Sequence, residues 1–227
     1  VRTVTPYVTG ISEEKGGAGN PSPITAYGVF MGMKAAAKYK FGSDLLEDKV
    51  VYVEGIGNVG ESLVEHLTNE GAKVVIADIN QSRLEEVRDR YSVEIYRGND
   101  LHAEQMDIYA PCALGATIND TTINKLKAKV IAGAANNQLE NEVSHGKMLQ
   151  AKGIAYAPDF LINAGGIINV YAELENYGKQ EIIRKTENIY NTTLEIFSKA
   201  DSLGLTTHQA AMSIARSRIE ARKAENK

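Results

Sequence analysis

The chain has 227 residues, of which 43% are hydrophobic and 24% charged, and its formal net charge at pH 7 is −4. A chain of this size can bury a substantial core, and an acidic balance without a long basic run excludes nucleic acid or an anionic membrane as its main partner. No apolar run reaches the ~20 residues that cross a bilayer, and one cysteine cannot form an internal disulfide. We therefore predict a cytoplasmic protein with no membrane partner.

The N-terminal region is predicted to form a linker followed by a helix. Residues 1–21 contain a loop rich in glycine and charge, which is typical of a hinge between domains, and the chain begins with Val1 rather than Met, so we expect the natural protein to extend further. Ser22 before Pro23 predicts an N-cap, and helical spacing continues over residues 25–40 to an end at Gly42. A hydroxyl bonded back within its own helical turn is the ordinary interpretation of Thr25.

The segment 50–60, Val-Val-Tyr-Val-Glu-Gly-Ile-Gly-Asn-Val-Gly, predicts a strand, a tight turn and a helix. In the dinucleotide-binding arrangement Gly55 forms the turn, Gly57 lets the backbone approach a pyrophosphate, and Gly60 lets helix and strand pack closely. The helix N-terminus then offers N–H groups to the phosphates. Glycines at this spacing also occur in ordinary turns, so the motif alone is weak evidence.

An acidic residue strengthens this interpretation. Asp78 ends the next predicted strand, where a carboxylate accepts the ribose hydroxyls of adenosine and repels a 2′-phosphate. We therefore predict NAD rather than NADP as the cofactor, with nearby Arg83 as the one feature that favours the opposite choice. The alternative is a turn of a parallel sheet with a solvated Asp.

Strands and helices alternate from residue 45 onward, which predicts an α/β fold: a Rossmann-type, doubly wound parallel sheet with right-handed crossovers and helices on both faces. We expect the cofactor-binding domain at residues 22–160 and a helical segment at 161–227 that packs back, broken near 176–179 and 203–206. The six strands are expected near Val50, Val74, Val93, Ile108, Val130 and Ile154.

Small residues and amides follow the later strands, at the edge where ligands bind in such sheets. Asn136, Asn137 and Asn163 offer donors and acceptors to a carboxamide or carboxylate, although amides also form ordinary turns. Cys112 has no histidine near it in the sequence and is predicted to be a small buried hydrophobe rather than a nucleophile. The four histidines lack metal-ligand spacing, so we predict no metal site and surface or capping roles for His66, His102, His145 and His208.

A series of motifs resembles one enzyme family along nearly the whole chain. The matching stretches are Tyr7-Val-Thr-Gly, Asn20-Pro-Ser-Pro-Ile-Thr-Ala-Tyr-Gly-Val, Gly55-Ile-Gly-Asn-Val-Gly, Ala110-Pro-Cys-Ala-Leu-Gly, Ala135-Asn-Asn-Gln-Leu and Asn163-Ala-Gly-Gly-Ile-Ile-Asn-Val. In this order they resemble the glutamate, leucine, phenylalanine and valine dehydrogenases, and within them the branch that contains leucine, phenylalanine and tryptophan dehydrogenases.

The resemblance implies NAD-dependent oxidative deamination of a branched-chain or aromatic L-amino acid to the 2-oxo acid, ammonium and NADH, by a homo-oligomer. It assigns the pyrophosphate to Gly55, Gly57, Asn58, Val59 and Gly60, and the adenosine ribose to Asp78 and Ile79. It assigns the nicotinamide side to Thr25, Cys112, Ala113, Ala134, Asn136 and Asn163. It assigns the substrate pocket to Asn137, Ile167 and Val170.

The resemblance also implies that a part of the enzyme lies outside this chain. In the family, an N-terminal domain carries the catalytic lysine, a second lysine for the substrate carboxylate and an aspartate, and no stretch of this chain matches it; Lys15 and Lys34 have no catalytic counterpart. We therefore predict that the chain binds NADH and turns over no amino acid. A free-standing NAD-binding or NAD-sensing module is the alternative.

Overall fold

The computed structural model describes residues 4–5, 8–9, 14, 17, 19–175 and 177–225. Most of the predicted linker, with Tyr7, Gly10 and Lys15, lies outside these residues, as does Asn176 in the first predicted helix break. The linker is therefore still a prediction.

The described residues form one parallel sheet of six strands in the order β3-β2-β1-β4-β5-β6. Each strand lies where the sequence predicts it, and the doubly wound topology is confirmed. Strand order reverses between β1 and β4, which is where such sheets bind ligands at the carboxyl ends of their strands. The strands are β1 (Val50–Glu54), β2 (Lys73–Ala77), β3 (Glu94–Ile95), β4 (Ile108–Pro111), β5 (Val130–Ile131) and β6 (Ala155–Tyr156).

Each face of the sheet has its own core, because successive residues of a strand point to opposite faces. Ile108 and Val130 pack into the core shared with α1 and α2, whereas Tyr109 and Ile131 pack into the core on the other face. The helices that follow the strands are α2 (Asn58–Asn69), α3 (Gln81–Tyr91), α4 (Thr122–Lys125) and α5 (Ser144–Ala151), and β3 and β4 are joined through a short 3-10 helix, η2 (Leu101–Ala103).

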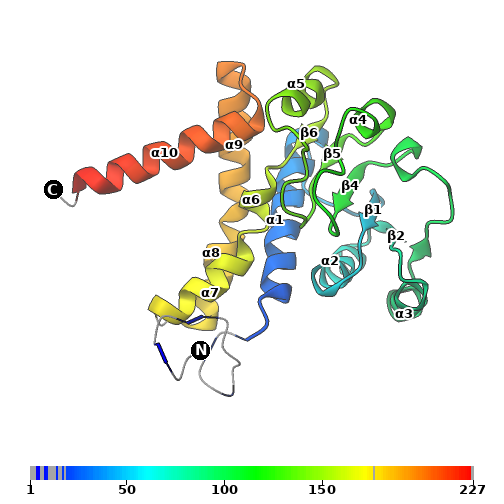
Figure 1. Cartoon of the computed structure of the whole chain (residues 1–227), viewed down its shortest axis with the longest axis horizontal. Helices are drawn as coiled ribbons and strands as arrows, with labels where there is room; N and C mark the ends of the chain where they lie inside the picture. The colour runs from blue at the N-terminus through cyan, green and yellow to red at the C-terminus, as the bar shows by residue number, and fades with distance from the viewer. Residues whose placement is uncertain are drawn as a thin grey trace.

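Helix α1 (Ser22–Phe41) lies between the sheet and the C-terminal helices (Figure 1). Its predicted end is confirmed, because Gly42 adopts φ +80° and its N–H binds the carbonyl of Lys38. The predicted N-cap at Ser22 is wrong: the helix already includes Ser22, and the side chain of Asn20 accepts the Ser22 N–H at 3.0 Å. The N-cap lies one residue earlier, at Pro21, whose ring fixes φ at a helical value of −74°.

The C-terminal helices that precede α10 pack against α1, so the segment packs back as predicted, whereas α10 packs against α9 and extends away from this bundle (Figure 1). A Cβ on Gly32 would lie 2.2 Å from Cγ2 of Ile162, so close packing of α1 on α6 requires glycine there. No helix in the described part of the chain is long and apolar enough to cross a membrane. The helices are α6 (Asp159–Ile162), α7 (Gly165–Glu175), α8 (Lys179–Glu187), α9 (Ile189–Leu203) and α10 (Thr207–Glu225).

Candidate cofactor site

The three glycines after β1 have different surroundings. Gly55 adopts φ +96°, and a Cβ there would lie 2.5 Å from Cβ of Ala113; a Cβ on Gly60 would lie 2.0 Å from the carbonyl oxygen of Gly55. Both glycines are therefore required by the fold itself. At Gly57, in contrast, no heavy atom lies within 4 Å of the Cβ position. The missing side chain of Gly57 thus leaves open surface at the N-terminus of α2.

Asp78 stands at the end of β2 beside this turn. Its Oδ2 accepts the backbone N–H of Ile56 at 2.8 Å, and its Oδ1 accepts the N–H of Asn80 at 2.9 Å. A carboxylate oxygen has two lone pairs, so both oxygens retain capacity for a ribose hydroxyl. The next residue, Ile79, is fully exposed. Asp78 and Ile79 therefore form an acceptor and an apolar surface side by side.

Cys112 connects the turn after β4 with the turn after β5. Its Sγ accepts the N–H of Ala134 at 3.5 Å, and it lies next to Gly60, where a Cβ would be 3.5 Å from Cβ of Cys112. Burial raises the pKa of the Cys112 thiol to about 12, so the thiol stays protonated at neutral pH. Cys112 is only partly buried by its exposed area, so it is less enclosed than the sequence predicts, and its protonated thiol is a poor nucleophile.

Two of the predicted amides meet at the same edge. Nδ2 of Asn163 donates to Oδ1 of Asn136 at 2.7 Å and to the carbonyl of Ala134 at 3.2 Å. Both amide hydrogens of Asn163 are used in this way, so its carbonyl oxygen and the amino group of Asn136 are the groups that the pair can offer to a ligand. An acceptor beside a donor is the complement of a primary carboxamide.

Thr25 on α1 lies against the start of α7, the helix that follows Asn163. Its hydroxyl donates to the carbonyl of Pro21 at 2.9 Å, which confirms the bond within its own helical turn. A Cβ on Gly166 would lie 2.7 Å from this hydroxyl, and a Cβ on Gly165 would lie 2.1 Å from the carbonyl of Ile24. The glycines at the start of α7 thus let α1 approach, and this approach brings Thr25 to the segment that carries Asn163.

The residues assigned to the substrate side are more dispersed. Asn137 is exposed with φ +53°, and its carbonyl accepts the N–H of Ala116 at 2.7 Å. Asn136 and Asn137 also line a cavity of about 260 Å³ with Asp159. Ile167, whose side chain is 70% exposed, and the half-buried Val170 lie further along α7.

A buried polar pair holds the loop with the two asparagines, and the sequence does not predict this role. Gln138 is fully buried; its N–H binds Oδ2 of Asp159 at 2.8 Å, and its Nε2 donates to the carbonyls of Gly133 and Ala135. Asp159 also accepts the N–H of Phe160 at 2.6 Å. The sequence places Asp159 directly after the sixth strand and therefore at this edge of the sheet. It does not indicate that the partner of Asp159 is Gln138, which is remote in sequence.

The four histidines lie in separate parts of the described chain. Among the residues that the structure describes, no three His, Cys, Asp or Glu side chains converge as a metal site would require. Of the two predicted roles, surface or capping, His145 has the second, because it is 2% exposed and accepts the N–H of Asn141 through Nδ1 at 3.0 Å. This contact is a capping interaction, because Asn141 lies just before α5.

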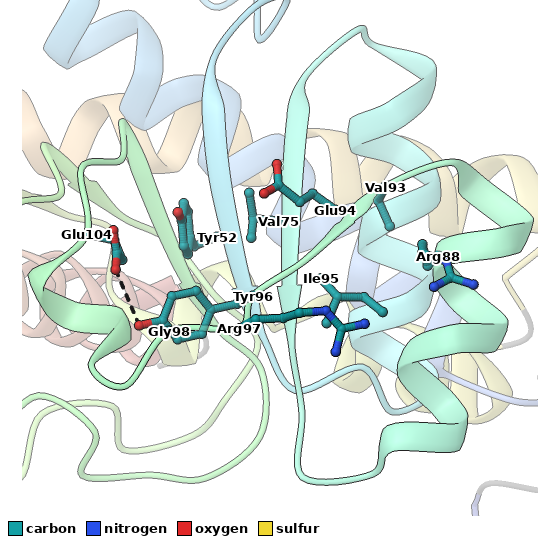
Figure 2. Close-up of a pocket in the computed structure, with 10 residues that line it drawn as sticks. All are labelled: Tyr52, Val75, Arg88, Val93, Glu94, Ile95, Tyr96, Arg97, Gly98 and Glu104. Carbon is teal, nitrogen blue, oxygen red and sulfur yellow. Dashed lines mark hydrogen bonds between the residues drawn. The ribbon is translucent and has the colours of Figure 1, made fainter.

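A larger hollow of about 560 Å³ lies over the other part of the sheet, on the face opposite α1. Figure 2 shows Tyr52 and Val75 on neighbouring strands, with the Tyr96 hydroxyl bonded to Glu104 at 3.4 Å. None of the residues that line it belongs to the predicted site. We therefore place the candidate site at the carboxyl ends of the strands and not in this hollow.

Comparisons with a family model and with known proteins indicate the same family. The model of the Glutamate/Leucine/Phenylalanine/Valine dehydrogenase family matches residues 16–80 and 76–226. Leucine dehydrogenase of Thermoactinomyces intermedius is 51% identical over 216 residues, which cover 95% of this chain and 59% of the relative. L-tryptophan dehydrogenase of Nostoc punctiforme is 45% identical over 222 residues, covering 96% of this chain and 62% of the relative.

Solved structures agree with the sequence comparison. The crystal structure of L-tryptophan dehydrogenase from Nostoc punctiforme superimposes with a TM-score of 0.86 at 44% identity, covering 90% of this chain and 61% of the other. The chain thus spans about three fifths of the length of these relatives. With the family model matched over nearly all of its residues, the chain belongs to the Glutamate/Leucine/Phenylalanine/Valine dehydrogenase family.

Proposed function

We propose that this chain binds NAD(H) at the carboxyl ends of its strands and is the cofactor-binding part of an NAD-dependent L-amino-acid dehydrogenase. The main support is the contrast between the glycines of the first turn. Gly55 and Gly60 are packed against other atoms, whereas the Cβ position of Gly57 faces open space. A fold needs no glycine at such a position, but a pyrophosphate that approaches the backbone does.

We assign the adenosine half of the cofactor to the carboxyl ends of β1 and β2. The first N–H groups of α2, at Asn58 and Val59, have no acceptor within the helix and bind the pyrophosphate. Asp78 accepts the ribose hydroxyls, and the exposed side chain of Ile79 contacts the adenine. A carboxylate at this position repels a 2′-phosphate, which is the reason for proposing NAD rather than NADP.

We assign the nicotinamide half of the cofactor to the segments that follow β4, β5 and β6. Bound NAD⁺ supplies the hydride acceptor of the reaction. The Asn163 carbonyl and the Asn136 amino group hold the carboxamide and thereby fix which face of the ring is open to substrate. Thr25, Cys112, Ala113 and Ala134 form the remaining wall, and the protonated thiol of Cys112 adds no charge to it.

The proposed reaction converts an L-amino acid, NAD⁺ and water into a 2-oxo acid, ammonium, NADH and a proton. Ile167 and Val170 on α7, with Asn137, are assigned to the substrate side, and relatives named leucine dehydrogenase and L-tryptophan dehydrogenase favour a branched-chain or aromatic side chain. None of the residues assigned above is a general acid or base, a role typically worth ~10²–10⁴-fold in rate. We assign that role to residues outside this sequence.

Fluorescence titration of the 227-residue chain with NADH and NADPH tests the cofactor assignment. Saturable NADH binding that is much tighter than NADPH binding is expected, together with no reduction of NAD⁺ by leucine, phenylalanine or tryptophan. Failure to bind NADH would refute the assigned site. Steady amino-acid-dependent reduction of NAD⁺ by the same preparation would show that the acid–base groups lie within this chain.

Assembly and location are part of the same proposal. We expect a homo-oligomer, and exposed apolar side chains on α7 and α10, among them Leu174 and Ile219, suit contacts between subunits. Sedimentation equilibrium of the chain measures this, and a monomer at all concentrations would contradict it. The unpaired Cys112 suits a reducing compartment, and we propose the cytoplasm.

A further inference from the structure

Arg83 lies beside the ribose end of the proposed cofactor site. It belongs to the first turn of α3, which follows Asp78, and its Nε donates to the carbonyl of Ile56 at 3.4 Å. Because Asp78 accepts the N–H of Ile56, the carboxylate and the guanidinium bind the two polar groups of one residue. The guanidinium is therefore close to the place that the adenosine ribose would occupy.

A guanidinium next to this carboxylate is unexpected in a site that selects NAD. A 2′-phosphate carries a charge near −2 and three acceptor oxygens, and arginine is the side chain that usually binds it in dinucleotide sites. An unrestrained Arg83 would thus offset the repulsion that Asp78 exerts on NADP. The NAD selectivity proposed above requires that the guanidinium be kept away from the 2′-oxygen.

Glu61 provides such a restraint. It lies in the first turn of α2, its side chain is only 12% exposed, and its two oxygens form ion pairs with Arg83 and Arg90. The side chain of Arg83 is 29% exposed, so this ion pair is largely shielded from water. Charge-assisted hydrogen bonds of this kind are about twice as strong as neutral ones, and shielding from solvent strengthens them further.

We propose that Glu61 determines specificity for NAD over NADP by holding the Arg83 guanidinium against α2 and away from the ribose 2′-position. This inference rests on the proposed cofactor site. Selectivity then has two parts: Asp78 repels the 2′-phosphate, and Glu61 withholds the cation that would attract it. Glu61 is a positioning residue, since it acts through Arg83 and contacts no cofactor atom.

The second partner of Arg83 provides a matched control. Glu86 lies one helical turn further along α3 and pairs with Arg83 at 3.3 Å, but its side chain is 56% exposed. Exposed ion pairs contribute little. Loss of the Glu86 carboxylate should therefore leave Arg83 in place, whereas loss of the Glu61 carboxylate should release it.

The test measures NADPH and NADH affinities of the chain and of its variants by fluorescence titration. Glu61→Gln keeps the shape of the side chain and removes its charge, and Glu61→Ala removes the acceptor altogether. Either variant should raise NADPH affinity relative to NADH by about ten- to hundredfold, the value of one hydrogen bond to a charged group. Glu86→Gln should change this ratio less than about twofold, as expected for an exposed pair.

Two further variants separate release of Arg83 from simple loss of negative charge. The double variant Glu61→Gln with Arg83→Gln should return the ratio to that of the unsubstituted chain, and Arg83→Gln alone should leave it unchanged. An unaltered ratio in both Glu61 variants would overturn the proposal, and so would a raised ratio that persists in the double variant. Absence of NADH binding by the unsubstituted chain is a separate result, which refutes the cofactor site itself.

Discussion

The carboxylate of Asp78 accepts the backbone N–H of Ile56 at 2.8 Å, so the residue that ends β2 is bonded to the turn that follows β1. Asp78 therefore has two roles in the proposed site, since the side chain assigned to the ribose also holds the turn assigned to the pyrophosphate. A substitution that removes its charge should weaken both.

Asp78→Asn should weaken NADH binding by about ten- to hundredfold, because hydrogen bonds to a charged acceptor contribute ~1.5–3 kcal/mol. It should also lower the free energy of unfolding by ~1–3 kcal/mol, since its amide NH₂ faces the N–H of Ile56 or of Asn80. Fluorescence titration and urea unfolding measure the two effects. Asp89→Asn, at an exposed position of α3, is the control and should change neither. Unchanged NADH affinity in Asp78→Asn would exclude its contact with the ribose.

Gly57→Ala and Gly60→Ala should affect different properties, cofactor binding and stability respectively, although both add one methyl group to the same turn. At Gly60 the methyl meets the carbonyl of Gly55, so the free energy of unfolding should fall by ~1–3 kcal/mol, as in other overpacked sites. At Gly57, where φ is −64°, the methyl meets no protein atom, so stability should be unchanged while NADH binding is lost. If Gly57→Ala binds NADH as tightly as the unsubstituted chain, the pyrophosphate does not lie on this turn.

Asn163→Asp should disrupt the part of the proposed site that is assigned to the nicotinamide. The carboxylate replaces two donated hydrogen bonds with repulsion from Oδ1 of Asn136 and the carbonyl of Ala134, which should cost ~1–3 kcal/mol of folding free energy. Binding of NADH should weaken because the amide pair is disrupted, whereas binding of ADP-ribose, which lacks the nicotinamide, should change little. Equal losses for both ligands would show that Asn163 acts on the fold alone.

Asp107 should make the stability of the chain depend on pH. Burial acts to raise the pKa of this carboxyl, but hydrogen bonds from the Val50 N–H and the Lys129 ammonium outweigh it and keep the pKa below its usual range. A group whose pKa is lower in the folded state stabilises the fold above its unfolded pKa of ~3.9, and this contribution is lost as pH falls through the folded pKa.

Asp107→Asn should therefore lower the free energy of unfolding by ~1–2 kcal/mol at pH 7, the value of a hydrogen bond to a charged group. The difference from the unsubstituted chain should shrink as pH falls below ~4, because the carboxyl then takes up a proton in the unfolded state first and in the folded state at lower pH. Urea unfolding between pH 3 and 7 measures this. A difference that is constant over this range would show that the carboxylate charge has no part in the contact.

Much of the fold could be predicted from sequence because its signals are local. Period-two and helical patterns indicate six strands and the helices around them, and Gly42 marks the end of α1 through a left-handed φ. The glycine turn and Asp78 predict the adenosine half of the proposed site in the same way, since both belong to one strand–turn–helix–strand unit.

The tertiary structure decided what distant segments do to one another. It buries His145 with its Nε2 against Asp120, and it pairs Gln138 with Asp159 and Glu61 with Arg83, all through contacts between segments that only the packed fold brings together. The spacing of residues along the sequence does not predict these partners, because side-chain pairing depends on how the helices pack across the sheet. The sequence by itself determined where the glycine turn after β1 stands. The packing of α2 against α3 decided that a cation beside this turn is held in an ion pair.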